Sequence, residues 1–417
     1  MLKNGQNNTT LSLKFRIFIP FALAFFMSNL FRSINSVLAP TFTEQFNMSG
    51  TQLAMMTSAY FFSFALVQIP IGVSLDRFGA SKTLSAFILF AVAGSVTFSY
   101  ANSVSMLLIG RALVGIGVAG CLMSALKSFN VWFDKKTAIL FNSWIGFVGG
   151  VGGIVSTKPI VIALDYINWR QLFLVLGGLT LLIAISIAVL VPLHPEERNK
   201  SDSIGKQFSE SFKIMLTGKF WRLAPIAIFG QATYLAFFSL WIGPWYRDVA
   251  GKSAESIPNL LLICSVMLAI GYLINGYVAR ILNERINLSF FATFILAMSL
   301  MTLCMVFLAF IPSAGTILWP AFLVLGPFSV ISYPIFANMF DTKYTGRVQT
   351  AYNMLVFIST TVIQTAIGKI LDLSGSTGDG TYNPSGYTIA LLAISACFTL
   401  SILWALFFRR SKKEINY

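Results

Sequence analysis

The ionisable residues that could do chemistry in this sequence lie inside long apolar runs. Arg32, Arg111, Lys127 and Lys158 each fall within such a run. The 15 acidic residues instead lie in loops, in tails or at the ends of runs. A buried charge is costly in a membrane and marks a candidate functional site. Guanidinium groups bind carboxylate or phosphate through paired hydrogen bonds, so this one-sided pattern predicts a binding site for a small anion.

Three of these cations are predicted to lie at similar depths. At a rise of 1.5 Å per residue, Arg32, Arg111 and Lys158 all fall in the outer halves of their segments. We expect these three side chains to contact the substrate. The competing hypotheses are a structural role for Arg111 and an outward-snorkelling Lys158. Lys127 lies about 24 Å from Arg111 along the same helix, and we expect it to snorkel to the inner surface.

The elements that must position these residues are membrane-spanning helices. Of the 417 residues, 56% are hydrophobic and 11% are charged, about half the usual charged fraction. Backbone polar groups in lipid must be satisfied within each segment, so apolar runs of about 20 residues predict helices. The expected fold class is therefore an all-α integral membrane protein with twelve transmembrane helices. The predicted spans are 15–39, 52–75, 83–101, 104–131, 138–164, 171–193, 220–247, 257–279, 287–311, 316–340, 348–371 and 386–408.

The charge distribution predicts the orientation of the chain. The net charge is +14, and most of the 29 Lys and Arg residues fall on one side if both termini are cytoplasmic. This asymmetry is the positive-inside pattern, so the excess charge argues for membrane topology and against nucleic-acid binding. The first apolar run lacks a small-residue cleavage site and is expected to remain uncleaved. The short loops favour a multi-pass protein of a bacterial inner membrane.

The polar stretch HPEERNKSDSIGKQFSESFK, which begins at position 194, divides the chain. It predicts a bundle of six helices over 1–193, a cytoplasmic linker over 194–219 and a second bundle over 220–417. The halves resemble each other: DKKTA begins at Asp134 and DTKYTGR at Asp341, while Arg280 aligns with Asp76. Similar halves indicate a parallel internal repeat that can rock about a shared site. We therefore expect Asp134, Arg280 and Asp341 to take part in gating.

The stretch GVSLDRFGASKT, residues 72–83, resembles the signature loop of the major facilitator superfamily. The matching positions are Gly72, Asp76, Arg77, Gly79 and Lys82. Ala80 and Ser81 depart from the basic pair of the family pattern. RALVGIGVAG resembles the second signature of the family, with Arg111 and Gly115 in register. The resemblance covers nearly the whole chain and implies two pseudo-symmetric six-helix bundles.

Physically, the signature loop could act as a latch. Glycines allow a tight turn, and Asp76 could face a helix N-terminus or a cation of the other half. A partly exposed pair contributes about 1 kcal/mol or less, enough to bias two states and weak enough to break in each cycle. The resemblance implies the same role. The alternative, which we favour for Lys82, is that the charges only fix topology.

The resemblance also implies a role for Arg32, because an arginine in helix one contacts the substrate in members that carry organic or phosphorylated anions. The symmetric basic residue of helix seven is missing here. Gln231, Tyr234 and Trp241 occupy that helix and are expected to contribute substrate contacts. Trp169, Trp245 and Trp319, near the outer ends of helices, are expected to be interface anchors.

We therefore predict a secondary transporter of a small organic anion, a carboxylate or similar, working by alternating access. The alternatives are an exporter of drugs or metabolites, for example a siderophore-like chelate, and a non-transporting membrane sensor. No acid–base pair, metal spacing or nucleotide loop is present, so we expect neither an enzyme nor a cofactor. The expected partners are the anion, the bilayer and a co-transported proton or counter-anion, and the chain is expected to be monomeric.

Overall fold

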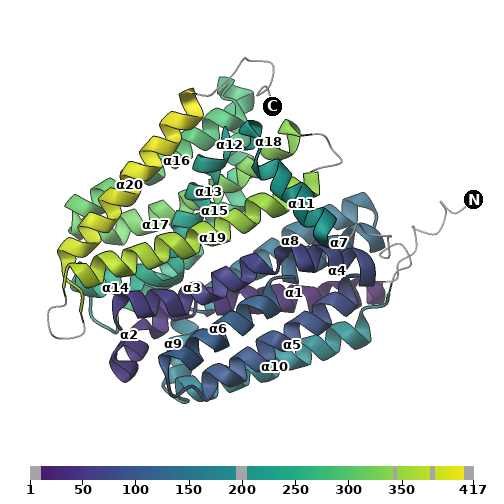
Figure 1. Cartoon of the computed structure of the whole chain (residues 1–417), viewed down its shortest axis with the longest axis horizontal. Helices are drawn as coiled ribbons and strands as arrows, with labels where there is room; N and C mark the ends of the chain where they lie inside the picture. Colours follow the sequence, from purple (N-terminus) through teal and green to yellow (C-terminus); the bar gives the residue numbers. More distant parts are fainter. Residues whose placement is uncertain (1–10, 194–203, 341–344, 376–380, 408–417) are drawn as a thin grey trace, which may run out of the picture. The chain divides into compact units, whose positions relative to one another are not determined.

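The computed structural model describes residues 11–193, 204–340, 345–375 and 381–407. These residues are almost entirely helical and contain no β-strand (Figure 1). Within these residues, eleven helical stretches are long and apolar enough to cross a bilayer. The count becomes twelve if Gly50–Leu66 and Gln68–Phe78, which are bent by 43° at their junction, are taken as one span. The predicted fold class is confirmed.

The chain packs as two compact units. One lies within Met1–Arg32 and Ala59–Gln207, the other within Ser33–Ser58 and Phe208–Tyr417. The end of the first predicted span and the start of the second therefore belong to the unit that contains the C-terminal helices. The sequence predicts bundles over 1–193 and 220–417, joined by a linker over 194–219. The grouping by contacts does not test this division, which remains a prediction.

The first half of the chain forms ten helices in its described part. They are α1 (Leu11–Ser33), α2 (Asn35–Phe46), α3 (Gly50–Leu66), α4 (Gln68–Phe78), α5 (Ala80–Ser99), α6 (Val104–Val118), α7 (Cys121–Trp132), α8 (Lys135–Val155), α9 (Lys158–Leu164) and α10 (Trp169–Leu190).

The second half begins with the helix α11 (Ile204–Met215), which lies in the predicted linker. The further elements are α12 (Gly218–Trp221), α13 (Ala224–Ala236), the π-helical turn η2 (Phe237–Trp241), α14 (Ile242–Asp248), α15 (Ile257–Ile286), α16 (Phe290–Phe310), η3 (Pro312–Ala314), α17 (Gly315–Leu325), η4 (Gly326–Ile331), α18 (Ser332–Met339), α19 (Thr345–Leu373) and α20 (Pro384–Phe407).

Local sequence explains where several helices begin. Asn168 and Gln171 form a capping box at the start of α10, each side chain accepting from the other residue's backbone N–H at 3.0 Å. Ser49 and Gln52 do the same at the start of α3, at 3.2 and 3.0 Å. The first span breaks at Ile34, so that α1 and α2 are separate helices.

Small residues let helices of the first unit pack closely. The helices α5, α6 and α10 lie side by side, as Figure 1 also shows. A Cβ atom on Gly117 would lie 2.3 Å from the backbone nitrogen of Ala91. This contact between α5 and α6 therefore has no room for a side chain at position 117.

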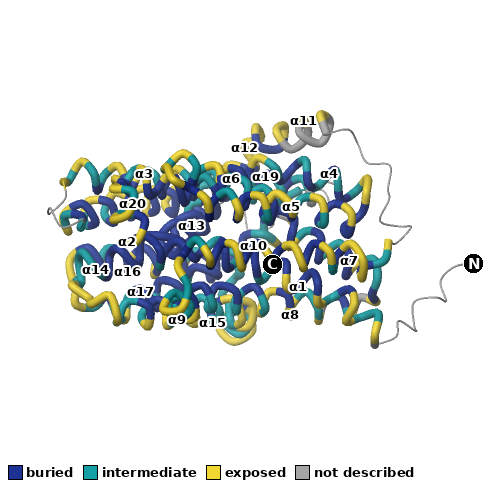
Figure 2. Tube along the Cα trace, turned by 90° about the horizontal axis from the view of Figure 1, so that it is seen from below, coloured by how far each residue is buried: buried dark blue, intermediate teal, exposed yellow. Residues whose placement is uncertain are grey.

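Helix α13 with η2 and α14 forms the most buried span of the second unit (Figure 2). Trp245 and Trp319 are fully buried, with ring centroids 5.6 Å apart in an edge-to-face arrangement. The expectation that they anchor the chain at the membrane interface is therefore wrong. Trp169, the third expected anchor, is also buried, and its ring packs against that of Phe98. All three rings lie in edge-to-face contacts inside the protein, an arrangement that adds to the gain from burial.

We predict that Gly117→Ala lowers the thermal stability of the purified protein. The new methyl group must push α5 away from α6, and overpacking of this kind typically costs about 1–3 kcal/mol. The measurement is the unfolding midpoint in detergent. Gly178→Ala on α10 is the control, since a Cβ there meets nothing within 4 Å. Equal midpoints for both variants would contradict the close contact.

Candidate anion-binding site

Arg111 on α6 is fully buried inside the first unit. Its Nη1 donates to the backbone carbonyl of Phe31 at 2.8 Å, and its guanidinium carbon lies 5.1 Å from the centroid of the Tyr60 ring. Within the described part of the chain, its Nε and Nη2 atoms have no hydrogen-bond partner. A buried guanidinium with two unpaired nitrogen atoms can donate hydrogen bonds to an anionic ligand.

Arg32 lies in the last turn of α1, directly after the residue that Arg111 contacts. Its Nη1 lies 3.5 Å from Oδ1 of Asn29, and its guanidinium carbon lies 5.8 Å from the centroid of the Phe64 ring. Its side chain is partly buried. The face of an aromatic ring attracts a cation, so Phe64 stabilises the charge of Arg32.

Two aromatic residues of α3 bring these arginines together. Tyr60 and Phe64 are four residues apart and therefore share one face of the helix. The Tyr60 hydroxyl donates to the carbonyl of Ser28 at 3.1 Å, which ties α3 to α1. A Cβ on Gly115 would lie 2.3 Å from the Tyr60 carbonyl oxygen, so this glycine lets α3 approach α6. Arg32 and Arg111 therefore contact two rings on the same face of α3. Their shared contact with a substrate remains a prediction.

Lys158 does not join this group. It is partly buried at the start of α9, and no hydrogen bond or ion pair ties its side chain to another described residue.

Lys127 pairs with the signature loop within the first unit. Its Nζ lies 2.7 Å from both Oδ1 of Asp76 and the carbonyl oxygen of Leu75. The Asp76 side chain is 46% exposed and that of Lys127 is 21% exposed. The cation that faces Asp76 in the structure therefore belongs to the same unit. The proposed latch to the other half remains a prediction.

The other loop residues are placed by the turn between α4 and α5. Gly79 ends α4 with a φ of 82°, a conformation that favours glycine. Arg77 and Lys82 are exposed, and the Arg77 guanidinium lies 5.4 Å from the Phe78 ring centroid. A Cβ at Gly72 meets nothing within 4 Å, so close packing does not explain that glycine.

The predicted gating residues of the repeat have local partners. Asp134 caps α8 by accepting from the Thr137 hydroxyl at 2.7 Å and from the backbone N–H groups of Thr137 and Lys136. These hydrogen bonds, that of the Thr137 hydroxyl first, lower the pKa of the Asp134 carboxyl. Arg280 pairs with Glu284 one turn away at 3.3 Å, with both side chains exposed. Asp341 lies outside the described residues.

In the second unit, Gln231 belongs to a polar cluster among buried side chains. The Tyr352 hydroxyl lies 3.0 Å from Oε1 of Gln231 and 3.1 Å from the Ala227 carbonyl oxygen, and it accepts from Ser332 at 3.0 Å. A hydroxyl has one proton, so Tyr352 can donate to only one of its two acceptors. The Gln231 side-chain oxygen and the Ala227 carbonyl therefore compete for this proton.

Tyr234 and Trp241 occupy different surroundings. The hydroxyls of Tyr234 and Tyr272 are 2.7 Å apart, and Tyr272 is an exposed residue of the second unit. Trp241 is fully buried, and its Nε1 donates to the Gln364 carbonyl at 3.3 Å. The tyrosine pair can present a hydroxyl to a ligand, whereas the Trp241 donor is already used.

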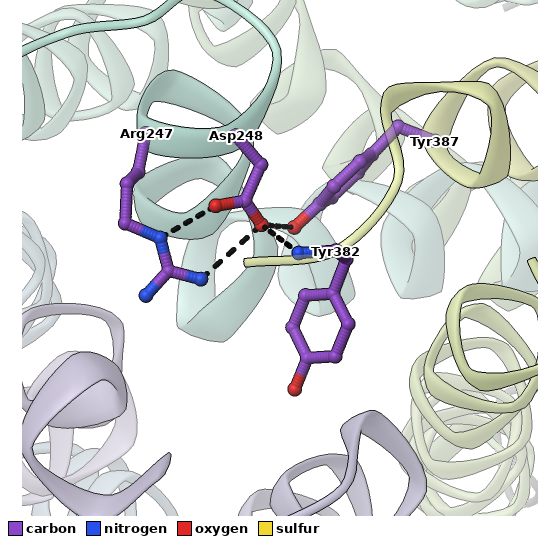
Figure 3. A network of polar contacts seen from close by, with 4 residues as sticks. All are labelled: Arg247, Asp248, Tyr382 and Tyr387. Atoms are coloured by element: carbon purple, nitrogen blue, oxygen red, sulfur yellow. Dashed lines mark hydrogen bonds and ion pairs between the residues drawn. The ribbon is translucent and has the colours of Figure 1, made fainter. Parts of the chain in front are cut away.

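Sequence analysis missed two carboxylates of the second unit. Asp248, the last residue of α14, is fully buried and accepts from Arg247 and from the hydroxyl of Tyr387 at 2.8 Å (Figure 3). It also accepts from the Tyr382 backbone N–H at 3.3 Å. Asp372, near the end of α19, accepts backbone hydrogen bonds from α3. The sequence signal that could have identified Asp248 is its position next to Arg247, an opposite charge, at the end of an apolar run.

Tyr382, between the last two spans, links these carboxylates. Burial, followed by the charge of Asp372, raises the pKa of the Tyr382 hydroxyl to about 12. The phenol therefore stays protonated at physiological pH and does not add a negative charge beside the two acids.

Comparison with known proteins decides the family. The model of the Major Facilitator Superfamily matches residues 21–363. The chain belongs to the major facilitator superfamily. As a superfamily member it is a multi-pass membrane protein, and it resembles the organic-anion-type members.

Three relatives illustrate the similarity of this superfamily member. It is 26% identical over 275 residues to the hexuronate transporter of Bacillus subtilis, covering 63% of this chain and 64% of that one. It is 23% identical over 276 residues to a probable sulfoacetate transporter of Cupriavidus necator, covering 63% of each chain. These matches span less than two thirds of either relative. It is also 23% identical over 441 aligned positions to the L-fucose-proton symporter of Escherichia coli, covering 95% and 94%.

Solved structures share its fold. The inward-facing, unoccupied form of a bacterial homologue of the human lysosomal transporter Spinster matches with a TM-score of 0.71 at 18% identity, covering 97% of this chain and all of that one. The nucleoside transporter NupG matches with a TM-score of 0.74 at 10% identity, covering 95% of this chain. At these identities the likeness establishes the fold of this superfamily member and nothing about its substrate.

A double-mutant cycle on Asp76→Asn and Lys127→Met should give a coupling free energy of about 0.2–1 kcal/mol. The pair is partly exposed, and solvent screens such pairs. The measurement is the free energy of unfolding of the four proteins in detergent. A coupling well above this range would contradict the view that the pair is weak enough to break during a transport cycle.

Proposed function

We propose that the protein is a secondary active transporter that moves a small organic anion, a carboxylate or similar, by alternating access. The observation that carries this proposal is the buried Arg111, whose Nε and Nη2 lack partners in the described residues. Arg32, beside the carbonyl that Arg111 holds, supplies the forked guanidinium for the anion. An anion would satisfy donors that otherwise cost free energy inside the membrane.

The similar proteins support the charge of the substrate. Their names include galacturonate, hexuronate, sulfoacetate and 4-hydroxybenzoate transporters, and each of these substrates is a carboxylate. Carriage of such an acid also suits proton co-transport or exchange against a counter-anion. Lys158 stays a proposed substrate contact, to be tested with the same ligands.

The second unit supports a substrate that carries hydroxyl groups. Gln231 and Tyr234 are proposed contacts, because their neighbours Tyr352 and Tyr272 are hydroxyl groups that a hydroxylated ligand can replace as hydrogen-bond partners. Trp241 is proposed to shape this span by packing, since its only side-chain donor meets the Gln364 carbonyl.

The topology is also proposed. Both termini are cytoplasmic in a bacterial inner membrane, as the positive-inside distribution indicates, and the protein acts as a monomer. The loop with Gly72, Asp76, Arg77, Gly79 and Lys82 then lies on the cytoplasmic side and gates that side. Asp134, Arg280 and Asp341 are proposed to assist there.

We expect Arg32→Gln to weaken binding of carboxylates at least about 30-fold, since losing one partner of a buried charge pair costs about 2 kcal/mol or more. The measurement is calorimetric titration of ligands found by a thermal-shift screen of anions at two pH values. Arg16→Gln is the matched control, because that arginine lies on the same helix and is exposed. An unchanged dissociation constant in Arg32→Gln would remove the site, and a response only to hydrophobic cations would favour a drug exporter.

Gln231→Leu should weaken binding of hydroxylated carboxylates about 10-fold and leave carboxylates without hydroxyl groups unaffected. One lost hydrogen bond to a ligand accounts for a change of this size. The comparison of galacturonate with a non-hydroxylated acid such as succinate, in the same variant, provides the internal control. Equal losses for both ligands would show that Gln231 acts on folding and does not select the substrate.

A further inference from the structure

The segment 33–58, which comprises α2 and the first half of α3, packs with the C-terminal helices. The chain leaves the first unit directly after Arg32 and re-enters it at Ala59. One piece of the first two spans is therefore held in the second unit, while the rest of the same spans holds the two arginines. A specific contact is therefore expected between segment 33–58 and the C-terminal helices of the same unit.

The carboxylate of Asp372 provides that contact. Its Oδ1 accepts from the backbone N–H of Gly50 at 2.6 Å, and its Oδ2 accepts from the N–H of Thr51 at 2.8 Å. These N–H groups belong to the first turn of α3, which has no intrahelical acceptors for them. The negative charge also lies at the positive end of the helix dipole.

Small residues continue this contact along the two helices. A Cβ on Gly368 would lie 2.5 Å from the Gly50 carbonyl oxygen and 2.9 Å from the Ala54 Cβ, so the backbones of α3 and α19 nearly touch. One turn further, Ser58 donates to Oε1 of Gln364 at 3.1 Å, and Thr365 lies 3.5 Å from the Ser58 hydroxyl. The contact therefore follows one face of α3 over Gly50, Ala54 and Ser58.

The buried Asp248 supports the contact between Asp372 and Gly50 indirectly, through Tyr382. It fixes the backbone of Tyr382 by a hydrogen bond at 3.3 Å, with Arg247 neutralising its charge (Figure 3). The Tyr382 ring in turn borders Gly50, whose Cβ would lie 3.2 Å from Cε1 of that ring. The Arg247–Asp248 pair thus positions the ring that packs beside the Asp372 contact.

We propose that segment 33–58 is a gate of the transport cycle and that Asp372 is its latch. This inference rests on the proposed function, since a transporter must open each side once per cycle. Backbone N–H groups released by Asp372 can bond to water, so the latch can open reversibly. The segment begins directly after Arg32, so the arginine is its neighbour in sequence.

The first experiment measures opening of the gate without any substrate. In a Cys397→Ser background, Ala54→Cys places a thiol in the α3–α19 contact, where Ala54 is fully buried. Asp372→Asn keeps the shape of the carboxylate but replaces one acceptor by a donor that faces an N–H. We expect it to raise the rate of maleimide labelling at position 54 at least about 5-fold. Asp165→Asn, an exposed acid after α9, should leave the rate unchanged.

The second experiment locks the gate and remains decisive if Asp372→Asn fails to fold. Ser58→Cys with Thr365→Cys should form a disulfide on oxidation, because the two hydroxyls are 3.5 Å apart. Cross-linked protein in liposomes should lose transport of the anion found by screening, regain it with reductant and still bind the anion. Unchanged labelling in Asp372→Asn, or full transport by cross-linked protein, overturns the proposal. Failure of all anions to bind would instead refute the proposed function and leave the labelling result standing.

Discussion

The structure depends on how a buried cation is held in an apolar helix bundle without being neutralised. Arg111 donates one hydrogen bond to the Phe31 carbonyl and lies against the Tyr60 ring. These contacts recover part of the cost of removing a charge from water, yet they add no opposite charge. The remaining donors are the physical reason to expect an anion, and the small Gly115 makes the arrangement possible by letting α3 approach α6.

In the second unit, by contrast, a buried charge is paired with an opposite charge. Asp248 is fully buried but accepts from Arg247, Tyr387 and the Tyr382 backbone, so its charge and lone pairs are satisfied locally. Substitution of either partner of such an ion pair is strongly destabilising, because it leaves the other charge buried and unpaired. A satisfied pair suits a framework role, whereas the unused donors of Arg111 suit a ligand.

Membership of the superfamily connects these local arrangements to transport. The fold is shared with proteins of quite different substrates, including a nucleoside transporter, so the family explains the helices and leaves the selectivity to a few side chains. The first unit holds cationic and aromatic side chains around Arg111, and the second holds hydroxyls and an amide around Gln231. Their role in selecting a substrate is a proposal.

The sequence alone determined the spans, the family and the cationic character of the first unit, because hydropathy and charge along a helix are local properties. It placed Arg32 and Arg111 at one depth, since helical rise is constant. Only the tertiary structure decided which groups meet. Asp372 contacts Gly50 more than 300 positions away in sequence, and no periodicity encodes such a pairing. The burial of Trp245 and Trp319, the pairing of Asp76 with Lys127 and the grouping of segment 33–58 with the C-terminal helices likewise depend on packing between distant segments.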